Sequence, residues 1–233
     1  MRSFRFYLVS TPIGNLGDIS SRAVDVLSSV DLVLAEDTRK ARILLTHYGV
    51  KTPVRSYHDH NKERITPSLI RQMRSGKTIA LIADAGTPTV SDPGYYIIRK
   101  LIEEGIEFTA IPGPSAVLQA LVLSGLPPDR FTFFGYVPRS AGARRRVIME
   151  AAEGIGTAVF FESPRRLRKT LAEIAGLLED REVVVARELT KIHEEIVRGS
   201  ASVLLEHFTA NVPKGEITLL IRGTGKRKRA GTA

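Results

Sequence analysis

Asp84–Gly94, which reads Asp-Ala-Gly-Thr-Pro-Thr-Val-Ser-Asp-Pro-Gly, has the residue types of a ligand-binding loop. Its two glycines allow the backbone to approach a ligand closely, and its two prolines stiffen the path of the chain. Thr87, Ser91 and Asp92 add hydroxyl and carboxylate partners. A capped turn between a strand and a helix would also account for Ser91 and Asp92. So many special residues in one segment nevertheless favour a binding loop.

Two other segments combine glycine, proline and hydroxyl residues. Ser10–Asp18 and Ile111–Ala116 each lie at the end of an apolar run. There is no G-x-G-x-x-G pattern of dinucleotide-binding proteins and no G-x-x-x-x-G-K-[ST] phosphate loop. Ser115 fits the N-cap of a helix, whose first N–H groups could bind a carboxylate or a hydroxyl-rich ligand. Three such loops indicate one compact ligand of mixed polarity, such as a cofactor of the adenosine type.

Charged and polar side chains gather in two further segments. In Glu36–Arg39, Asp37 could cap the following helix, and Arg39 could bind a phosphate. Tyr57–Lys62 contains two histidines and Asn61, and it fits either a loop that reaches toward a substrate or a solvated surface loop. We expect no metal site, because no further histidine or cysteine stands at ligand spacing.

The composition indicates an ordinary globular protein with a basic surface. The chain has 233 residues, 43% of them hydrophobic, and no cysteine, which excludes disulfides and thiolate nucleophiles. No apolar run approaches the roughly 20 residues of a membrane helix, and the first residues indicate a strand rather than a signal peptide. The net charge of +9 favours a polyanionic partner, nucleic acid first, although a merely solvated basic protein fits equally well. G-x-S-x-G and H-E-x-x-H are both absent, so hydrolysis is not indicated.

Apolar runs and amphipathic segments alternate along the chain, which predicts an α/β fold. In the first half we expect strands over Phe4–Ser10, Asp31–Ala35, Thr78–Ala83 and Glu107–Ile111. We expect helices there over Ser20–Ser29, Thr38–His47, Ile65–Ser75, Gly94–Glu104 and Ser115–Ser124.

In the second half we expect strands over Phe131–Gly135, Thr157–Phe161, Glu182–Glu188, Glu195–Gly199 and Glu216–Ile221. The expected helices are Ala141–Ala152, Pro164–Leu178 and Ser200–Phe208. The segment from Ser124 to Asp129 is typical of a linker. We therefore predict an N-terminal lobe of residues 1–124 with a mainly parallel sheet, a C-terminal lobe of residues 125–223 with a mixed sheet, and a basic, disordered tail of residues 224–233. A ligand cleft between the two lobes is expected.

The segments that carry a family resemblance are Tyr7–Ser20, Ala35–Arg39, Tyr57–Asn61, Asp84–Gly94, Ile111–Ala116 and Phe161–Leu167. Together they resemble the tetrapyrrole methylase superfamily of S-adenosylmethionine-dependent enzymes. Within it, they are similar to the branch that methylates the ribose 2′-oxygen of a cytidine in 16S ribosomal RNA. Tetrapyrrole methylases open with a G-x-G-P-G-D pattern. This chain has Ser10-Thr-Pro-Ile-Gly-Asn15 there, which favours the RNA branch.

The resemblance implies a two-lobed fold that holds S-adenosyl-L-methionine in the cleft between the lobes. It also implies a cytoplasmic homodimer that acts on 16S rRNA in the 30S subunit or its precursor. By motif match, the cofactor-binding residues would be Pro12, Gly86, Thr87, Pro88, Val90, Ser115 and Ala116 from the first half. Phe161, Leu189 and Gly215 would add to them from the second half.

For catalysis, we hypothesise that Asp37, Arg39, His58 and Asn61 face the acceptor ribose and its phosphates, with Arg39 and Arg139 anchoring the RNA. Alignment of oxygen, carbon and sulfur would supply much of the acceleration, and a general base would assist. No single residue identifies itself as that base. Two alternatives remain: a tetrapyrrole C-methyltransferase acting on a precorrin or uroporphyrinogen, and a non-catalytic RNA-binding protein on the same scaffold.

Overall fold

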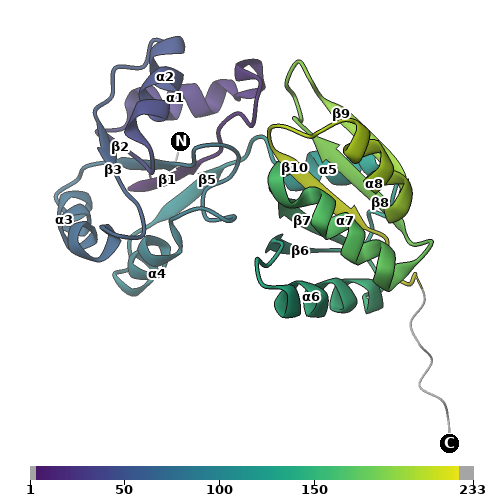
Figure 1. Ribbon diagram of the computed structural model, residues 1–233. Coiled ribbons are helices and arrows are strands. Elements are labelled where there is room, and N and C mark those ends of the chain that lie inside the picture. Colours follow the sequence, from purple (N-terminus) through teal and green to yellow (C-terminus); the bar gives the residue numbers. More distant parts are fainter. Residues whose placement is uncertain (1–3, 226–233) are drawn as a thin grey trace, which may run out of the picture. The chain divides into compact units, whose positions relative to one another are not determined.

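The computed structural model describes residues 4–225 of the chain, which form two compact units (Figure 1). The division falls between Ser115 and Ala116. Helix α5 (Ala116–Ser124) packs against strands of the second unit, so it belongs to that unit. From the sequence, this helix was predicted to lie in the N-terminal lobe, and the predicted linker begins at its last residue, Ser124. The predicted basic tail lies almost wholly outside the described residues.

The first unit is a five-stranded sheet with the order β3-β2-β4-β1-β5. Every neighbouring pair of strands is parallel, as expected for this half. The strands are β1 (Phe6–Val9), β2 (Leu32–Ala35), β3 (Val54–Ser56), β4 (Ile79–Ile82) and β5 (Phe108–Ile111). The helices are η1 (Leu16–Asp18), α1 (Ser21–Ser29), α2 (Thr38–His47), α3 (Lys62–Arg74) and α4 (Tyr95–Glu103).

Helices cover both faces of this sheet, which is why its central strands are apolar on both sides (Figure 1). One core cluster joins Ala23 and Leu27 of α1 and Leu45 of α2 to the strand residues of one face. A second cluster joins Leu69 of α3 and Leu101 of α4 to the other face. All four residues of the central strand β4 are buried.

The second unit is also five-stranded, with the order β6-β7-β10-β8-β9. Its strands are β6 (Phe131–Tyr136), β7 (Thr157–Glu162), β8 (Glu182–Arg187), β9 (Glu195–Ser200) and β10 (Ile217–Ile221), and its further helices are α6 (Ala141–Glu153), α7 (Pro164–Leu178) and α8 (Ala201–Ala210). β6 and β7 are parallel and the other three pairs are antiparallel, so the predicted mixed sheet is confirmed. Helices α6, α7 and α8 contribute to a core on one face, and α5 lies on the other (Figure 1).

The expected helices and strands are confirmed, apart from shifts at their ends, the short helix η1, which was not predicted, and the differences at β3 and α3. β3 was not predicted, because three residues are too few to show a periodic pattern. α3 begins at Lys62 rather than Ile65, and Pro67 lies inside it. Among residues 4–225, no helix combines the length and the apolar character needed to cross a bilayer.

The start of α4 depends on a glycine, which gives a first prediction. Gly94 has a φ of 144°, and a Cβ added there would lie 2.8 Å from Thr89 Cγ2 and 3.0 Å from Leu81 Cδ2. We expect Gly94→Ala to lower the free energy of unfolding by about 3 kcal/mol in urea titrations, through backbone strain and overpacking. Gly105→Ala is the control, because Gly105 also has a positive φ but an open surrounding, and it should cost only about 1 kcal/mol. Equal losses in the two variants would contradict the steric account.

Candidate functional site

The parallel register of the first unit brings the carboxyl ends of all its strands to one edge of the sheet, where ligands bind in open α/β proteins. The segments that leave this edge begin at Ser10, Glu36, Tyr57, Ala83 and Pro112. They are the same segments that the sequence singled out for their residue types. Three of them, those after β1, β4 and β5, form a connected arrangement that we call the turn cradle.

The turn cradle is tied together by backbone hydrogen bonds. Thr11 N–H donates to the Gly86 carbonyl at 2.9 Å, and Gly86 N–H donates to the Thr11 carbonyl at 3.0 Å. The Thr11 hydroxyl is buried and donates to the Ala83 carbonyl at 3.1 Å. On the other side, Ser10 N–H donates to the Ile111 carbonyl at 3.2 Å. The three turns are therefore fixed relative to one another.

Small residues allow these turns to lie close together. A Cβ added to Gly113 would lie 2.9 Å from Ser10 Cβ. Gly86 has a φ of 79°, and a Cβ there would lie 3.7 Å from the Pro114 carbonyl oxygen. The hydroxyls of Ser10 and Thr87 form a hydrogen bond of 3.0 Å. Of the predicted cofactor residues, Pro12, Gly86 and Pro88 are buried here, Thr87 and Ser115 are half-buried, and Val90 is exposed.

The rest of the Asp84–Gly94 loop holds an uncommon backbone conformation. Thr89 and Ser91 have φ angles of 75° and 64°, in the left-handed region that side chains other than glycine seldom adopt. Val90 lies between them and is 40% exposed. Strain of this kind costs about 1–3 kcal/mol per residue and concentrates at ligand-binding sites. The loop therefore has the character of a functional segment rather than of a plain turn.

A group of charged side chains lies where β2 and β4 end. Lys40 Nζ is 2.8 Å from Asp84 Oδ2, and Asp37 N–H donates to Asp84 Oδ1 at 3.3 Å. Asp92 faces the same charges from the following loop. Its burial, together with the nearby carboxylates of Glu36 and Asp84, raises the pKa of Asp92 to about 6, and Lys40 opposes this shift. Asp92 thus releases its proton close to neutral pH.

Asp37 and Arg39 pair with each other. Asp37 caps α2 by accepting a hydrogen bond of 2.8 Å from Arg39 N–H, and Arg39 Nη2 lies 2.9 Å from Asp37 Oδ2. Hydrogen bonds from the Arg39 side chain and backbone lower the pKa of Asp37 to about 2. Asp37 is therefore a weak base that orients Arg39, whose side chain is largely exposed. The sequence offered capping and phosphate binding as roles for these residues, and the geometry accommodates both.

His58 and Asn61 form a closed turn after β3. Asn61 Oδ1 accepts from His58 N–H at 3.0 Å, while Asn61 Nδ2 lies 3.1 Å from Ser56 Oγ and 3.2 Å from His58 Nε2. Nδ1 of the same ring is buried and has no hydrogen-bond partner within residues 4–225. Asn61 thus fixes the position of the His58 ring through contacts with both its backbone and its side chain.

The predicted cofactor residues of the second unit lie near one end of its sheet. Leu189 follows β8 and is buried, and Gly215 precedes β10 with a φ of 83°. Their turns are joined by Glu188, whose Oε1 accepts from Glu216 N–H at 3.0 Å. Phe161 lies in β7, half-buried, opposite Thr218 of β10. Ala116 is the first residue of α5.

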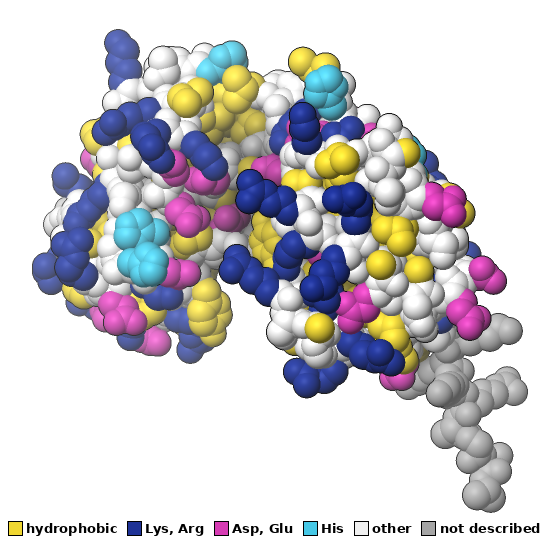
Figure 2. Space-filling model, viewed as in Figure 1, with side chains coloured by type: hydrophobic (Ala, Val, Ile, Leu, Met, Phe, Trp, Pro, Cys, Tyr) yellow, Lys and Arg dark blue, Asp and Glu magenta, His cyan; other side chains and the backbone are white. Residues whose placement is uncertain are grey.

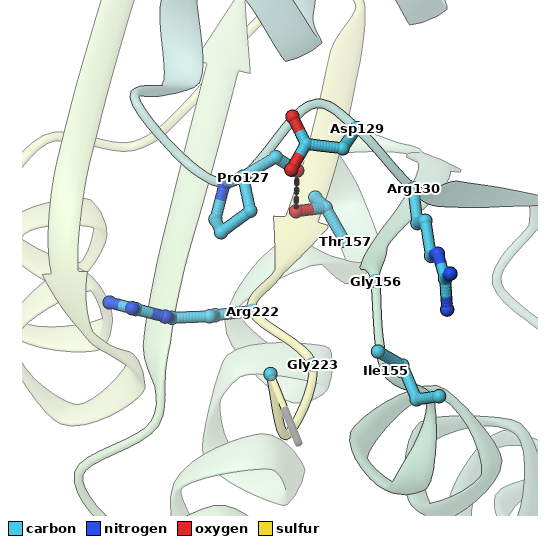
Figure 3. Close-up of a pocket in the computed structure, with 9 residues that line it drawn as sticks. Pro127, Asp129, Arg130, Ile155, Gly156, Thr157, Arg222 and Gly223 are labelled. Carbon is cyan, nitrogen blue, oxygen red and sulfur yellow. Dashed lines mark hydrogen bonds between the residues drawn. The ribbon is translucent and has the colours of Figure 1, made fainter. Parts of the chain in front are cut away.

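A cavity of about 560 Å³ opens at the other end of this sheet, beside the first residues of β6 and β7 (Figure 3). Its lining includes Arg130, Thr157 and Arg222. The two arginine side chains point apart (Figure 3), Arg222 is paired with Glu182 at 2.9 Å, and the Thr157 hydroxyl donates to the Pro127 carbonyl. The cavity therefore lacks a converging set of free polar groups.

Sequence reasoning did not single out Lys40, which pairs with Asp84. It named Asp92 as a possible partner of a ligand but did not predict its raised pKa, which depends first on burial and then on Glu36 and Asp84. The available signal was the number of carboxylates in segments that all follow parallel strands.

Known proteins are similar to this chain along almost its whole length. A family model described as Tetrapyrrole (Corrin/Porphyrin) Methylases matches residues 5–204. The Ribosomal RNA small subunit methyltransferase I of Thermotoga maritima is 43% identical over 94% of this chain and 98% of its own. Its namesake from Mesorhizobium japonicum is 46% identical over 92% of this chain and 74% of its own. Uroporphyrin-III-C-methyltransferase from Thermus thermophilus shares the fold, with a TM-score of 0.64 and 19% identity over 93% of each chain.

The burial of Asp92 and the carboxylates around it predict a gain in stability when its charge is removed. The folded-state pKa of about 6 lies above the ordinary value of 3.8, so ionisation disfavours the folded state, and stability falls as pH rises through this window. We expect Asp92→Asn to raise the free energy of unfolding at pH 8 by about 1–2 kcal/mol after allowance for solvent screening. The gain should shrink as pH falls through this window and vanish well below pH 3.8, where the wild-type carboxyl is protonated in both states.

Asp31→Asn is the control for Asp92→Asn, and urea unfolding at several pH values is the measurement. Hydrogen bonds from Thr78 lower the pKa of Asp31. Its loss should therefore destabilise the protein at neutral pH, with a difference that disappears as pH falls through the lowered pKa. A destabilised Asp92→Asn at pH 8 would contradict the electrostatic account.

Proposed function

Because the chain belongs to the tetrapyrrole methylase family, we propose that it transfers a methyl group from S-adenosylmethionine to the ribose 2′-oxygen of a cytidine in 16S ribosomal RNA. The main support is the near-full-length identity of 43% to a relative named Ribosomal RNA small subunit methyltransferase I. The parallel strands, with their turn cradle at the carboxyl edge, support the binding of a compact cofactor. The acceptor would be the 30S subunit or its precursor, so we place the protein in the cytoplasm.

The residues of the turn cradle fit a ligand that has both apolar and polar parts. Gly86 and Gly113 keep Cβ atoms out of the space between the turns, and Thr87 presents a half-buried hydroxyl. Pro12, Pro88, Val90 and Ser115 would supply apolar contacts and a further hydroxyl. We propose that these residues hold S-adenosylmethionine, with Ala116, Phe161, Leu189 and Gly215 contributing from the second unit.

When bound, S-adenosylmethionine supplies a methyl group that its sulfonium charge already activates. The protein must then orient a ribose hydroxyl and receive its proton. Asp92 is suited to accept that proton at its carboxylate, since a pKa of about 6 leaves it ionised but basic near neutral pH. Arg39, oriented by Asp37, would bind an RNA phosphate, and His58 would face the acceptor ribose. Asn61 would fix the orientation of His58.

Two partners follow from this proposal. The exposed arginines, Arg139 among them, would contact the phosphates of the rRNA, in accord with the net charge of +9. The resemblance to the rRNA methyltransferase branch also implies a homodimer, which sedimentation of the purified protein would reveal.

The proposed reaction is tested by incubating the purified protein with methyl-labelled cofactor and either 30S subunits or uroporphyrinogen. We expect label in 16S rRNA alone, and mass spectrometry of the digested rRNA should show 2′-O-methylcytidine. Label in the macrocycle would indicate the tetrapyrrole C-methyltransferase instead. Absence of cofactor binding by calorimetry would indicate a non-catalytic RNA-binding protein.

Substitutions on the cofactor side of the site and on the acceptor side should have different effects on cofactor affinity and on methyl transfer. Thr87→Val removes the hydroxyl that pairs with Ser10, and it should weaken cofactor binding about tenfold by calorimetry. Arg39→Gln should leave that affinity unchanged and reduce methyl transfer to 30S subunits at least about tenfold, because it loses a charged phosphate contact. Arg42→Gln, an exposed substitution on the same helix, is the control and should retain activity. Full activity of Arg39→Gln would remove Arg39 from the acceptor side.

A further inference from the structure

Three aromatic side chains gather on one face of the second sheet, at its β6 edge. The rings of Phe133 and Phe161 are 4.9 Å apart, and those of Tyr136 and Phe161 are 5.5 Å apart, both edge to face. Phe161 is half-buried, whereas Tyr136 is 61% exposed. We call these three residues the ring cluster.

A β-bulge creates the ring cluster. Phe133 and Phe134 alternate across the sheet, and Phe134 stacks on Phe160 of the core at 4.9 Å. Regular alternation would place Tyr136 on the same face as Phe134. The register shifts between Phe133 and Tyr136, where Gly135 has a φ of 71°, and Tyr136 is thereby turned to the face of Phe161. The bulge thus exposes a ring that a regular strand would have directed toward the core.

Two exposed arginines lie on the segments that follow the strands of the ring cluster. Val137 follows Tyr136, its N–H donates to the Phe161 carbonyl at 3.0 Å, and its carbonyl accepts from Arg166 Nη1 at 2.9 Å. This bond ties the end of β6 to the first turn of α7. Arg139 and Arg165 lie on these two segments and are exposed. Within residues 4–225, neither guanidinium forms an ion pair with a carboxylate.

The remaining charges near this edge are already neutralised. Glu162 is buried and accepts from Ser163 N–H at 2.7 Å, from the Thr170 hydroxyl at 2.5 Å and from Arg166 at 2.6 Å. Glu162 therefore adds no free negative charge beside the rings. In the space-filling view, Lys and Arg side chains gather on the second unit over β6, α6 and the start of α7, with hydrophobic side chains among them (Figure 2).

We propose that Tyr136 of the ring cluster, together with Arg139 and Arg165, binds an unpaired stretch of RNA, with a base stacked on Tyr136 and adjacent phosphates held by the two arginines, while Phe161 remains assigned to the cofactor. This inference rests on the proposed function, and it identifies the structural state of the acceptor as single-stranded. Exposed rings beside unpaired cations are the combination by which single-stranded RNA is bound, since every base has a face that can stack. A paired helix offers no free base face, so the surface selects against duplex.

The test measures binding of the full-length protein to a fluorescent single-stranded RNA of about twelve nucleotides that contains cytidines, without cofactor. We expect Tyr136→Leu to weaken binding about tenfold, the effect of losing one stacked base. Tyr136→Phe keeps the ring and should bind as the wild type does. The same sequence in a duplex should bind more weakly than the single strand. Equal affinity for the duplex, or equal loss in Tyr136→Leu and Tyr136→Phe, would overturn the proposal.

The arginines are tested through the salt dependence of the same binding. Arg139→Gln and Arg165→Gln should each reduce the slope of log affinity against log salt by about 0.7, the effect of one lost phosphate contact. Arg99→Gln, on an exposed position of α4, is the control and should leave the slope unchanged. Unchanged slopes in both test variants would overturn the assignment of these arginines.

Failure of this inference is distinguishable from failure of the proposed function. A wild-type protein that methylates 30S subunits while Tyr136→Leu binds RNA normally would refute the ring cluster alone. A wild-type protein that binds RNA through Tyr136 but transfers no methyl group to 30S subunits would refute the reaction alone. Cofactor affinity, measured by calorimetry, should be the same in Tyr136→Leu and the wild type, and a loss there would assign the ring to the cofactor instead.

Discussion

The pair of hydrogen bonds between Thr11 and Gly86 is the contact on which the candidate site depends. Parallel strands leave their connecting loops at one edge, but the sheet alone does not determine how those loops lie. The reciprocal bonds between the turns after β1 and β4, together with the bond from the buried Thr11 hydroxyl, fix the positions of these turns beyond the ends of the strands. The loop that carries Thr87, Val90 and Asp92 therefore begins from a fixed point, which a site that must orient two reactants requires.

The same loop shows how the surrounding structure maintains unfavourable features. Left-handed backbone at Thr89 and Ser91 and a carboxyl held among like charges at Asp92 each disfavour the folded state. They persist because the segment is anchored at both ends, by Gly86 on one side and by the close packing around Gly94 on the other. Local instability of this kind is expected at a functional site, where selection acts on activity as well as on stability.

The sequence predicted most of this fold because its strands are short apolar runs separated by turn residues, and its helices are amphipathic. β1, β4 and β10 are recognisable in this way, because strands that are covered on both faces of a sheet consist largely of apolar residues. β3 is not, because Val54–Ser56 is ordered by its pairing with β2 rather than by its own pattern. For the site, the glycine and proline turns were recognisable from residue type. The raised pKa of Asp92 and the pairing of Lys40 with Asp84 were not, because each requires residues from different strands to be brought together.

The charges of the second unit divide into buried ion pairs and exposed arginines. Its buried charges are matched: Arg144 lies beside Glu173, and Glu162 is neutralised by Arg166 and Thr170. Breaking such a buried pair would cost several kcal/mol, so these residues are needed for the fold. Arg139 and Arg165 are exposed, and their loss should cost little stability. The positive charge that the proposed RNA binding would use thus lies on side chains that contribute little to the stability of the fold.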